Sequence, residues 1–453
     1  MSAARPQPAR PRVQAPVRRR KAPNAFFVLV GLGLGIVIGI TVNAESARAF
    51  SAPGGVAMEL GRLAAMIGTY LLLVTVVLAG RLPVIERVLG HDRLIRWHRW
   101  LGPWPILLLT AHAVLTTLGY AQSERTGWAR ELWTFLTTYK GLLLAFVAFG
   151  LIVMAGVTSY RAVRRRMAHE TWWVIHLYMY LALALSFTHQ LANGQSFIGH
   201  PLSRLFWISL WVITAGVVLV YRIGSPLWRT LYHRLRVVQV KQEGNGVVSV
   251  VCKGHRLDRL PVAGGQFLHW RFLKPGMWWQ AHPYSLSALP RPPHLRITVK
   301  DLGDHSRSLS RLKPGTWVAI EGPYGAFTAE ARTGAGVLLV AAGVGSTPIR
   351  ALLEDLPVGV DLTVILRAST PDDLVLRDEI ATLVSNRRGR LHEVIGSRKK
   401  VRFDANTLHQ LVPDLQHRDV YICGPAGFAD MIVDSARKLG TPKSRIHREH
   451  FAF

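Results

Sequence analysis

The chain is built around residues 96–120, RWHRWLGPWPILLLTAHAVLTTLGY, and residues 170–190, ETWWVIHLYMYLALALSFTHQ. Each segment is long and apolar enough to cross a bilayer as a helix. The first carries His98 and His112, and the second carries His176. The second segment carries a further histidine, His189, just before its last residue, so the intervals are 14 and 13 residues. A rise of about 1.5 Å per residue then separates each pair by roughly 20 Å, which places one imidazole near each face of a membrane.

These four histidines are candidate metal ligands. Neutral imidazole binds iron well, and an ionisable group inside a bilayer is costly unless it has a role. A single histidine in a span is more often a packed polar residue, but two pairs at matched depth favour ligation. We therefore predict two haems stacked across the membrane, held by His98 with His176 and by His112 with His189.

The second segment raises a geometric question. On an ideal helix, an interval of 14 residues returns to within about 40° of the same face, whereas an interval of 13 ends about 140° away. Either this helix is locally distorted, or His176 and His189 reach haems on different sides of its axis. Both alternatives stay open at the level of sequence.

Composition restricts the class of protein. The 453 residues are 49% hydrophobic and carry a formal net charge of +28. Such a charge is common in nucleic-acid-binding proteins, but here the arginines gather in short loops between apolar runs, which indicates membrane topology and no nucleic-acid partner. The only cysteines, Cys252 and Cys423, exclude a disulfide framework and a four-cysteine iron–sulfur cluster.

The first half of the chain predicts a bundle of six membrane-spanning α-helices. Residues 1–24 are rich in Pro, Ala and Arg and predict a disordered basic tail. The apolar run from Ala25 to Val42 suits a retained span, with a cleaved signal peptide as the alternative. The other runs lie at about 60–80, 101–119, 141–159, 172–191 and 205–222.

Arginines predict the orientation of these spans. They are dense in the loops after the second and fourth spans, which places the tail, those loops and everything after Tyr221 in the cytoplasm of a plasma-membrane protein. The two histidine-bearing spans then run in the same direction, which gives the pairing above. Arg62, near the outer end of the second span, is either a snorkelling interface residue or a partner for haem propionates or an anionic acceptor.

The second half has the patterns of a soluble protein. From about Leu235, short alternating segments predict strands, and from Gly336 the order becomes strand, glycine turn, helix and strand. We predict an antiparallel β-barrel followed by an α/β domain with a parallel sheet. The predicted domains are a membrane domain at 25–222, a linker at 223–234, the barrel at 235–332 and the α/β domain at 333–453.

AHPYSLSALP, at residues 281–290, predicts a flavin site. Its tyrosine can stack on a flavin ring, and Ser285 can hydrogen-bond near the redox-active nitrogen; an ordinary turn is the alternative. Farther along, Lys300 can meet a phosphate, and the loop from Gly303 to Ser306, which includes His305, can present amides to a pyrophosphate. The turn EGPYG, at residues 321–325, either belongs to the same site or only links two domains.

AAGVGSTPIRALL, at residues 341–353, predicts a nucleotide site. Gly343 and Gly345 stand between a strand and a helix, where a phosphate can approach the helix N-terminus. The third glycine of the usual dinucleotide motif is absent. Arg367, at the end of the next strand, can pair with a 2′-phosphate and favour NADPH over NADH; a solvated charge is the alternative.

The end of the chain predicts the nicotinamide side of that site. Cys423 follows the last long strand, where the nicotinamide is expected, and a buried apolar thiol is the alternative. Phe451 and Phe453 are both candidates to stack on the flavin until the nicotinamide displaces them.

Together these features resemble the ferric reductase and NADPH oxidase superfamily, in which a two-haem membrane domain is fused to a ferredoxin–NADP reductase-like module. The resemblance covers about residues 25–453 and implies FAD, two b-type haems and NAD(P)H. From the residues themselves we predict Ser285, Cys423, Phe451 and Arg62 at the reacting centres. The motifs that carry it are the four histidines, His282-Pro283-Tyr284-Ser285-Leu286-Ser287, Gly322 and Gly325, Gly343 with Gly345, Thr347 and Pro348, Cys423-Gly424-Pro425, and Glu449 with Phe451.

The resemblance implies an oxidoreductase that passes electrons from cytoplasmic NAD(P)H through FAD and two haems to an acceptor on the other side. Dioxygen, giving superoxide, and chelated ferric iron are both consistent acceptors. A lipid bilayer is the expected environment, and no obligate protein partner is predicted. The alternatives are a haem–flavin protein that serves quinone or a partner reductase, and a non-catalytic redox sensor.

Overall fold

The computed structural model of the protein describes residues 22–44, 47–244, 246–397 and 403–449. Its contacts divide the chain into a helical unit over Arg20–Ile223 and a second unit that contains Gly224–Phe453. Six helices of the described chain are long and apolar enough to cross a membrane, which confirms the predicted number. These candidate spans are Ala25–Asn43, Gly55–Ala79, Arg93–Ser123, Leu142–Ser159, His169–Asn193 and Pro201–His233.

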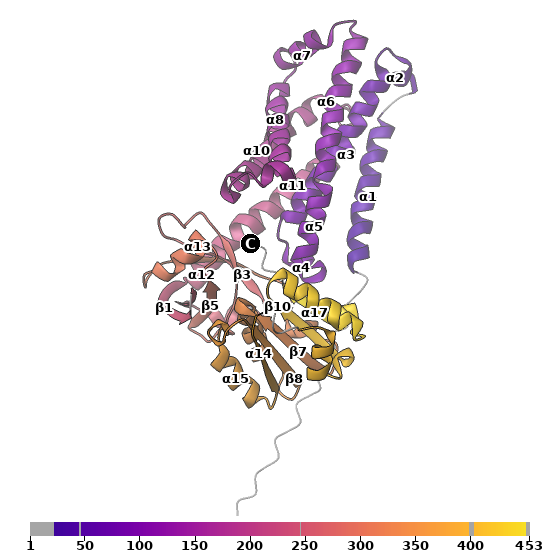
Figure 1. Ribbon diagram of the computed structural model, residues 1–453. Coiled ribbons are helices and arrows are strands. Elements are labelled where there is room, and N and C mark those ends of the chain that lie inside the picture. Colours follow the sequence, from indigo (N-terminus) through magenta and orange to yellow (C-terminus); the bar gives the residue numbers. More distant parts are fainter. Residues whose placement is uncertain (1–21, 45–46, 245, 398–402, 450–453) are drawn as a thin grey trace, which may run out of the picture. The chain divides into compact units, whose positions relative to one another are not determined.

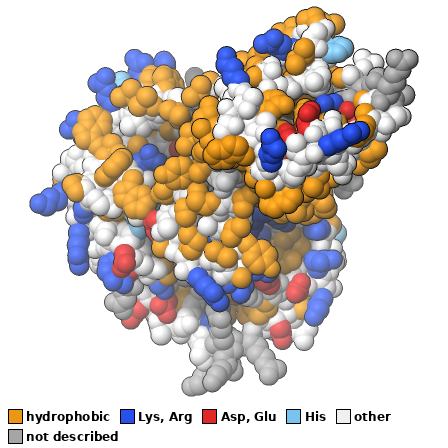
Figure 2. Space-filling view, turned by 90° about the horizontal axis from the view of Figure 1, so that it is seen from above, with side chains coloured by type: hydrophobic (Ala, Val, Ile, Leu, Met, Phe, Trp, Pro, Cys, Tyr) orange, Lys and Arg blue, Asp and Glu red, His pale blue; other side chains and the backbone are white. Residues whose placement is uncertain are grey.

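The helical unit has the exposed apolar surface that lipid requires. Leu107 and Leu205, for example, keep 61% and 62% of their surface exposed. Figure 2, which views the whole molecule from above, shows many hydrophobic side chains on the surface. The helices of this unit (Figure 1) are α1 (Ala22–Asn43), α2 (Ala47–Ser51), α3 (Gly55–Ala79), α4 (Pro83–Leu89), α5 (His91–Leu101), α6 (Pro103–Ser123), α7 (Trp128–Thr137), α8 (Leu142–Ser159), α9 (Arg161–Arg164), α10 (His169–Asn193) and α11 (Pro201–Val217), which continues as a π-helix, η1 (Val218–Gly224).

Glycines allow the closest helix packing in this unit. α3 packs along α6, and α8 packs along α10. A Cβ on Gly61 would lie 2.7 Å from Oγ1 of Thr116, and one on Gly68 would lie 3.0 Å from Cβ of Leu108. Small residues at these points let the two backbones approach, as is common between membrane helices.

The two histidine-bearing spans differ in regularity. α5 ends at Leu101 and α6 begins at Pro103, because proline has no N–H for the helical ladder; the Gly102 amide closes α5 on the His98 carbonyl at 2.9 Å. By contrast, α10 is one unbroken α-helix. This regularity excludes a local distortion of the second span. The remaining alternative is that His176 and His189 project from different sides of the helix.

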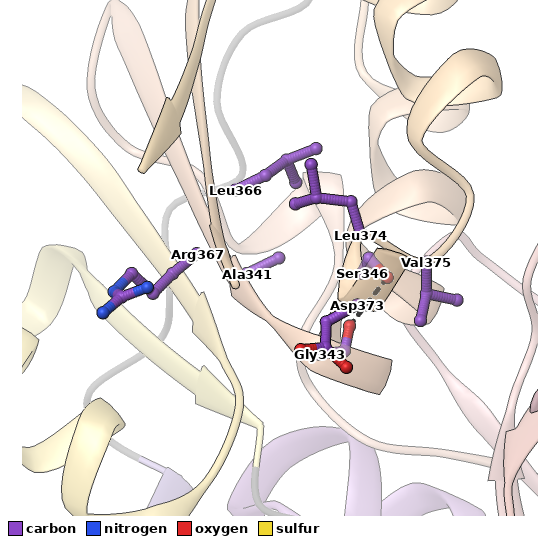
Figure 3. A pocket seen from close by; sticks show the side chains of 8 residues that line it. All are labelled: Ala341, Gly343, Ser346, Leu366, Arg367, Asp373, Leu374 and Val375. Atoms are coloured by element: carbon purple, nitrogen blue, oxygen red, sulfur yellow. Dashed lines mark hydrogen bonds between the residues drawn. The ribbon is translucent and has the colours of Figure 1, made fainter. Parts of the chain in front are cut away.

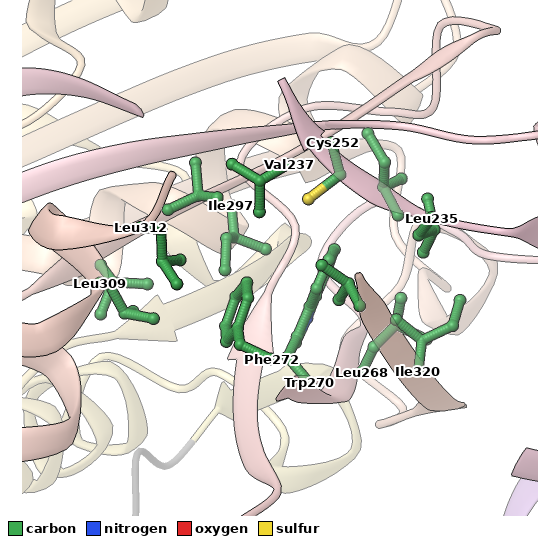
Figure 4. Close-up of a cluster of buried hydrophobic side chains, with 14 of the residues drawn as sticks. Leu235, Val237, Cys252, Leu268, Trp270, Phe272, Ile297, Leu309, Leu312 and Ile320 are labelled. Carbon is green, nitrogen blue, oxygen red and sulfur yellow. The ribbon is translucent and has the colours of Figure 1, made fainter. Parts of the chain in front are cut away.

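The second unit begins with a helix and an antiparallel barrel-like domain. Two three-stranded sheets, in the orders β1-β2-β5 and β4-β3-β6, enclose one apolar core, and Figure 4 shows Trp270, Phe272 and Ile297 meeting inside it. Alternate residues of β3 point into this core, as the alternating sequence predicts. The elements are α12 (Ser225–His233), β1 (Arg236–Gly244), β2 (Val247–Lys253), β3 (Phe267–Phe272), β4 (His282–Ser285), β5 (His294–Lys300), α13 (Asp304–Ser308) and β6 (Val318–Tyr324).

A doubly wound α/β domain follows, which confirms the predicted fold class. Its parallel sheet has the order β11-β10-β7-β8-β9. Successive residues of β7 enter different cores, Leu339 with α14 and α15 on one face and Leu338 with α16 and α17 on the other. The elements are β7 (Gly336–Ala342), α14 (Ser346–Asp355), β8 (Asp361–Ala368), α15 (Arg377–Asn386), β9 (Arg390–Ile395), α16 (Ala405–Leu411), β10 (Arg418–Cys423), α17 (Ala426–Lys438) and β11 (Ile446–Glu449).

Candidate functional site

His98 on α5 and His176 on α10 lie next to each other. Their ring centroids are 6.0 Å apart, with 77° between the ring planes. Nδ1 of His98 lies 2.9 Å from the carbonyl oxygen of Thr75 on α3. Because a carbonyl only accepts, Nδ1 carries the proton and Nε2 keeps its lone pair. Two imidazoles that share one metal through bonds of about 2 Å have ring centres about 6 Å apart, so the spacing fits a pair that would hold one metal together.

Polar and aromatic neighbours orient His176. Its Nδ1 lies 3.4 Å from Oγ of Ser159, which also accepts a hydrogen bond of 3.1 Å from Nε1 of Trp172. The Trp172 ring stacks on the His176 ring at 5.2 Å, and the Arg164 guanidinium lies 4.3 Å from the Trp172 centroid. The end of α8 and the first turns of α10 thus hold this imidazole from its Nδ1 edge and from one face.

The second pair, His112 and His189, repeats part of this arrangement. Nδ1 of His112 lies 3.0 Å from the Gly61 carbonyl oxygen and 3.1 Å from Oγ1 of Thr116. The absence of a side chain on Gly61 lets α6 come close enough for this contact. Nδ1 of His189 is buried and has no hydrogen-bond partner among the described residues. A buried polar atom without a hydrogen-bond partner is rare. The unpartnered nitrogen of His189 is therefore consistent with a ligand that binds this imidazole.

Between the levels of the two histidine pairs, the helices of this unit carry apolar residues. Leu73 of α3, Ile152 of α8 and Leu183 of α10 are buried together. Two polar levels separated by packed hydrocarbon suit two separate cofactors rather than one extended polar cavity.

Arg62 pairs with a carboxylate of its own helix, which was not among its predicted partners. Its Nη1 lies 2.8 Å from Oε1 of Glu59, one turn earlier on α3, and Glu59 is 5% exposed. A buried carboxylate in a membrane helix requires such a cation. The pair lies within three residues of Gly61, and so at the level of His112.

Ser285 offers a donor at the predicted flavin site. This last residue of β4 is 4% exposed, and its Oγ has no hydrogen-bond partner among the described residues. Such a hydroxyl is expected to bond to a ligand. Near it in sequence, Leu286 belongs to the barrel core and Ser287 accepts a 3.0 Å hydrogen bond from Nε of Arg296, while Pro283 stays exposed.

Two imidazoles and a phenol gather where β4, which ends at Ser285, meets α13. The His282 and His305 rings are 3.6 Å apart, and the Tyr284 hydroxyl lies 3.0 Å from Nδ1 of His305. Burial, followed by the nearby His282, lowers the pKa of His305 to about 4, so this imidazole is neutral at pH 7. Its Nε2 is also buried without a partner in the described part of the chain.

The predicted phosphate-binding loop closes partly on itself. The Gly303 amide lies 3.2 Å from Oδ1 of Asp301, and Oγ of Ser306 accepts from the Leu302 amide at 2.8 Å. Lys300 is half-buried at the end of β5. This loop therefore offers the side of α13 and Lys300, rather than the Gly303 amide, to a ligand.

The EGPYG turn joins three parts of the second unit. Arg229 of α12 donates to the Gly322 carbonyl, and Gln266 donates to the Gly325 carbonyl at 3.1 Å. A Cβ on Gly325 would lie 3.4 Å from the Phe267 ring and 3.9 Å from Oε1 of Glu449. The turn thus brings the barrel close to the end of β11.

The predicted nucleotide residues meet at the carboxyl edge of the parallel sheet. β7 lies between β8 and β10, so the strand order reverses beside it, which is where such sheets bind ligands. A Cβ on Gly345 would lie 2.2 Å from the Cys423 carbonyl oxygen, so this turn can pack against the end of β10 only with glycine. Gly343, in the left-handed region, opens the same turn. Cys423, Gly424 and Pro425 lie directly beside it.

Cys423 is fully buried. Burial raises its pKa well above the usual value, and the nearby Glu449 raises it further, so the thiol stays protonated at neutral pH. Phe451 and Phe453 lie outside the described residues.

A small pocket opens beside the glycine turn. Gly343, Ser346 and Asp373 come together in it, whereas Arg367 points away from them (Figure 3). Arg367 is 9% exposed and donates to the Val394 carbonyl at 3.1 Å and to the Ala368 carbonyl. Thr347 is also turned inward, with Oγ1 3.4 Å from the Thr298 carbonyl, and Pro348 is buried.

An ion-pair network joins the barrel to the α/β domain, and we call it the Arg296–Glu379 network. Arg296 of β5 donates two 2.7 Å bonds to Glu379 of α15. Arg350 of α14 donates to Glu379 at 2.8 Å and to Glu354 at 2.5 Å. Glu354 also accepts from the Leu289 amide at 2.9 Å. The segments that carry Ser287 and the glycine turn are thereby linked.

Three family models match successive parts of the chain. They describe a ferric reductase like transmembrane component at residues 64–187, an FAD-binding domain at 232–328 and an oxidoreductase NAD-binding domain at 339–434. The chain thus joins a ferric reductase-like membrane domain to FAD- and NAD-binding domains.

Individual relatives match parts of the chain. An NADPH oxidoreductase of Mycobacterium tuberculosis is 28% identical over 244 residues, which are 51% of this chain and 63% of that protein. The ferric/cupric reductase transmembrane component 1 of Candida albicans is 23% identical over 318 residues, 66% of this chain and 38% of that protein. Among solved structures, the FAD/NAD-binding domain of a nitric oxide dioxygenase from Vibrio cholerae is 25% identical, with a TM-score of 0.42. The match covers 48% of this chain and 98% of the solved chain. The chain spans less than two thirds of the length of these two curated relatives.

Proposed function

Starting from a multi-pass oxidoreductase with the architecture of ferric reductases and NADPH oxidases, we propose that the chain moves electrons from NAD(P)H across a membrane to an external acceptor. The observation that carries the proposal is the pair of imidazoles 6.0 Å apart in the ferric reductase-like domain, one of them with its Nδ1 proton held by a backbone carbonyl. When bound, FAD would accept a hydride and two b-type haems would carry single electrons between the faces of the bilayer.

The residues of the membrane domain would hold and tune the proposed haems. His98 with His176 would hold one, and His112 with His189 would hold the other. The Thr75 and Gly61 carbonyls fix the tautomer of one imidazole in each pair, which keeps Nε2 available and makes the ring a better donor. The Arg62–Glu59 pair is the proposed electrostatic partner at the His112 level.

The residues of the second unit position the flavin and the nucleotide. Ser285 is proposed to hydrogen-bond near the reacting edge of the flavin, with Tyr284 against its ring. The turn at Gly343–Gly345 is proposed to receive the nucleotide phosphates, and the neutral Cys423 thiol to border the nicotinamide. Arg367 donates to backbone carbonyls. We therefore propose that this residue does not set a preference between NADPH and NADH.

Arginine-rich loops support a cytoplasmic position for the FAD- and NAD-binding domains in a plasma-membrane protein. The acceptor is proposed to be ferric chelate or dioxygen. Ferric iron has the support of relatives named as ferric reductases. Superoxide detection under air, compared with ferrous iron formation without oxygen, distinguishes the two acceptors.

The ligand proposal is tested with His98→Leu in the purified full-length protein. We expect one of two haems to be lost, and NAD(P)H to reduce the flavin at an unchanged rate while haem reduction stops. His200→Leu is the matched control, because His200 precedes α11 and belongs to neither pair. Full haem content and full haem reduction in His98→Leu would contradict the assignment.

A further inference from the structure

A basic pocket lies on the barrel domain, and none of the residues that line it is proposed for the flavin or the nucleotide. It is lined by Arg234, Arg236, Lys253 and His255, with Val237 and Pro314 as apolar walls, and its volume is about 450 Å³. All four basic residues are exposed, and no carboxylate is among its described lining residues. A cavity of this size and charge suits a phosphate-bearing ligand.

The basic residues are presented in a way that favours an anion. Arg236 stacks over the Trp317 ring at 4.2 Å, which uses the face of the guanidinium and leaves its N–H edge to donate. Arg234 has a φ of 45° because it caps the C-terminus of α12 in the left-handed conformation, and this turns the chain from the helix into β1 at the pocket. Next to the pocket, Arg256 and Arg259 both approach the Tyr232 hydroxyl, at 3.4 and 3.3 Å.

The chain connects this pocket directly to the membrane. Arg234 directly follows the candidate membrane helix Pro201–His233. A helix of this length is about 50 Å long, against a hydrocarbon core of about 30 Å, so its last turns extend past the core into the headgroup region. The last turns of the span, in α12, expose Leu227 (57%), Trp228 (59%) and Leu231 (62%). Exposed tryptophan beside arginines is typical of the headgroup region of a bilayer.

We propose that the basic pocket binds the phosphate headgroup of an anionic phospholipid, with its acyl chains along Leu227, Trp228 and Leu231. The proposal commits to lipid rather than free phosphate because the apolar stripe and the end of the span lie beside the cations. A basic cluster directly after a membrane helix has this affinity in general. It rests on the membrane assignment but not on the proposed electron transfer.

The pocket also has a physical connection to the flavin site. α12 ends at its rim, and Arg229 in the same helix donates to the Gly322 carbonyl of the EGPYG turn. Backbone pairing ties the pocket to the helix as well, since the His255 amide donates to the His233 carbonyl at 2.6 Å. A bound headgroup would therefore hold α12, and with it this turn, in place.

The test titrates the detergent-solubilised full-length protein with short-chain phosphatidylglycerol, phosphatidylcholine and inorganic phosphate, and follows bound lipid by native mass spectrometry. Phosphatidylglycerol is expected to bind at least tenfold more tightly than the other two. The variant with Arg234→Gln, Arg236→Gln and Lys253→Gln is expected to weaken that binding about a hundredfold, since each cation near an anionic headgroup contributes roughly fivefold. Lys253→Gln alone, a milder change, is expected to weaken it about fivefold.

The matched control removes the same charge from the α/β domain with Arg437→Gln, Lys438→Gln and Lys443→Gln, and it should bind phosphatidylglycerol like the unmodified chain. If the control variant loses as much affinity for phosphatidylglycerol, binding depends on overall charge, and the proposed pocket is wrong. Equal binding of inorganic phosphate would overturn the commitment to lipid. Loss of FAD from Lys253→Gln would show that the pocket belongs to the flavin site instead.

Discussion

Replacing Glu379 by glutamine is expected to loosen the contact between the barrel and the α/β domain. The carboxylate accepts two 2.7 Å bonds from Arg296 and one of 2.8 Å from Arg350. The amide keeps the shape of the side chain, but it removes the negative charge and turns one acceptor into a donor that faces a guanidinium. Arg350, whose side chain is 7% exposed, then depends on Glu354 alone for compensation.

The size of the effect follows from the burial of the partners. Exposed ion pairs contribute about 0.2–1 kcal/mol, whereas breaking a buried pair costs about 3–5 kcal/mol. The Glu379 side chain is 34% exposed and that of Arg350 is 7% exposed, so we expect about 2 kcal/mol, between these limits. That value corresponds to a roughly 30-fold larger population of molecules with the domain contact open.

Hydrogen exchange of the α14 and α15 amides in the full-length protein measures this population, and anaerobic mixing with NAD(P)H measures the rate of flavin reduction. Both should change in Glu379→Gln. The matched control is Glu393→Gln, because Arg377 donates to Glu393 with similar bonds of 2.7 and 2.8 Å but within one domain and with its side chain 52% exposed. Equal exchange in the two variants would refute the idea that the Arg296–Glu379 network couples the domains.

The same network predicts a dependence on pH. Burial opposes the charge on Glu379, but the bonds and charges of Arg296 and Arg350 outweigh it and lower the pKa below the usual 4.5. The pKa of Glu354 is lowered as well, with burial opposed by the Leu289 amide and Arg291. A lowered pKa contributes stability that is complete above the unfolded value and is lost as pH falls through the folded one. The domain contact should therefore hold at pH 5–8 and weaken only below about pH 4.5.

Other predictions concern single side chains. Gly61→Val should reduce haem content by about half, because its side chain collides with α6 and separates the Gly61 carbonyl from His112, while Gly31→Val, with open space around it, should leave the haem-to-protein ratio unchanged. Cys252 and Cys423 should resist maleimide at pH 8 until the protein is denatured, since burial raises the pKa of Cys252 to about 12 and that of Cys423 well above its usual value; mass spectrometry counts the adducts. Arg367→Ala should destabilise the α/β domain by about 1–3 kcal/mol through unsatisfied carbonyls and leave the ratio of NADPH to NADH activity within twofold; a tenfold fall in that ratio would restore the 2′-phosphate assignment.

Much of the fold could be predicted from sequence because its signals are local. An apolar run of membrane-spanning length needs no partner to be recognised, and the strand, glycine turn and helix around Gly343 follow from neighbouring residues. The partners of the functional side chains come from distant segments instead. Arg296 bonds to Glu379, which lies 83 positions later in the chain. Arg367 is buried because β9 pairs with β8, and the local sequence does not reveal that pairing. A strand-end arginine looks the same in sequence whether it faces a phosphate or a carbonyl.

The least predictable part of the site is α3, which supplies no proposed ligand but arranges two of them. Its Thr75 and Gly61 carbonyls are 14 residues apart, as are His98 and His112, so an antiparallel neighbour meets both histidines in register. Every residue has a backbone carbonyl, so the sequence does not mark the carbonyls that accept from these histidines. They also cannot be removed by changing a side chain, only by moving the helix. Gly61 and Gly68, which permit the close approach of α3 and α6, therefore act on the imidazoles through packing. In this membrane domain the chemistry of the histidines depends on how closely two helices can lie together.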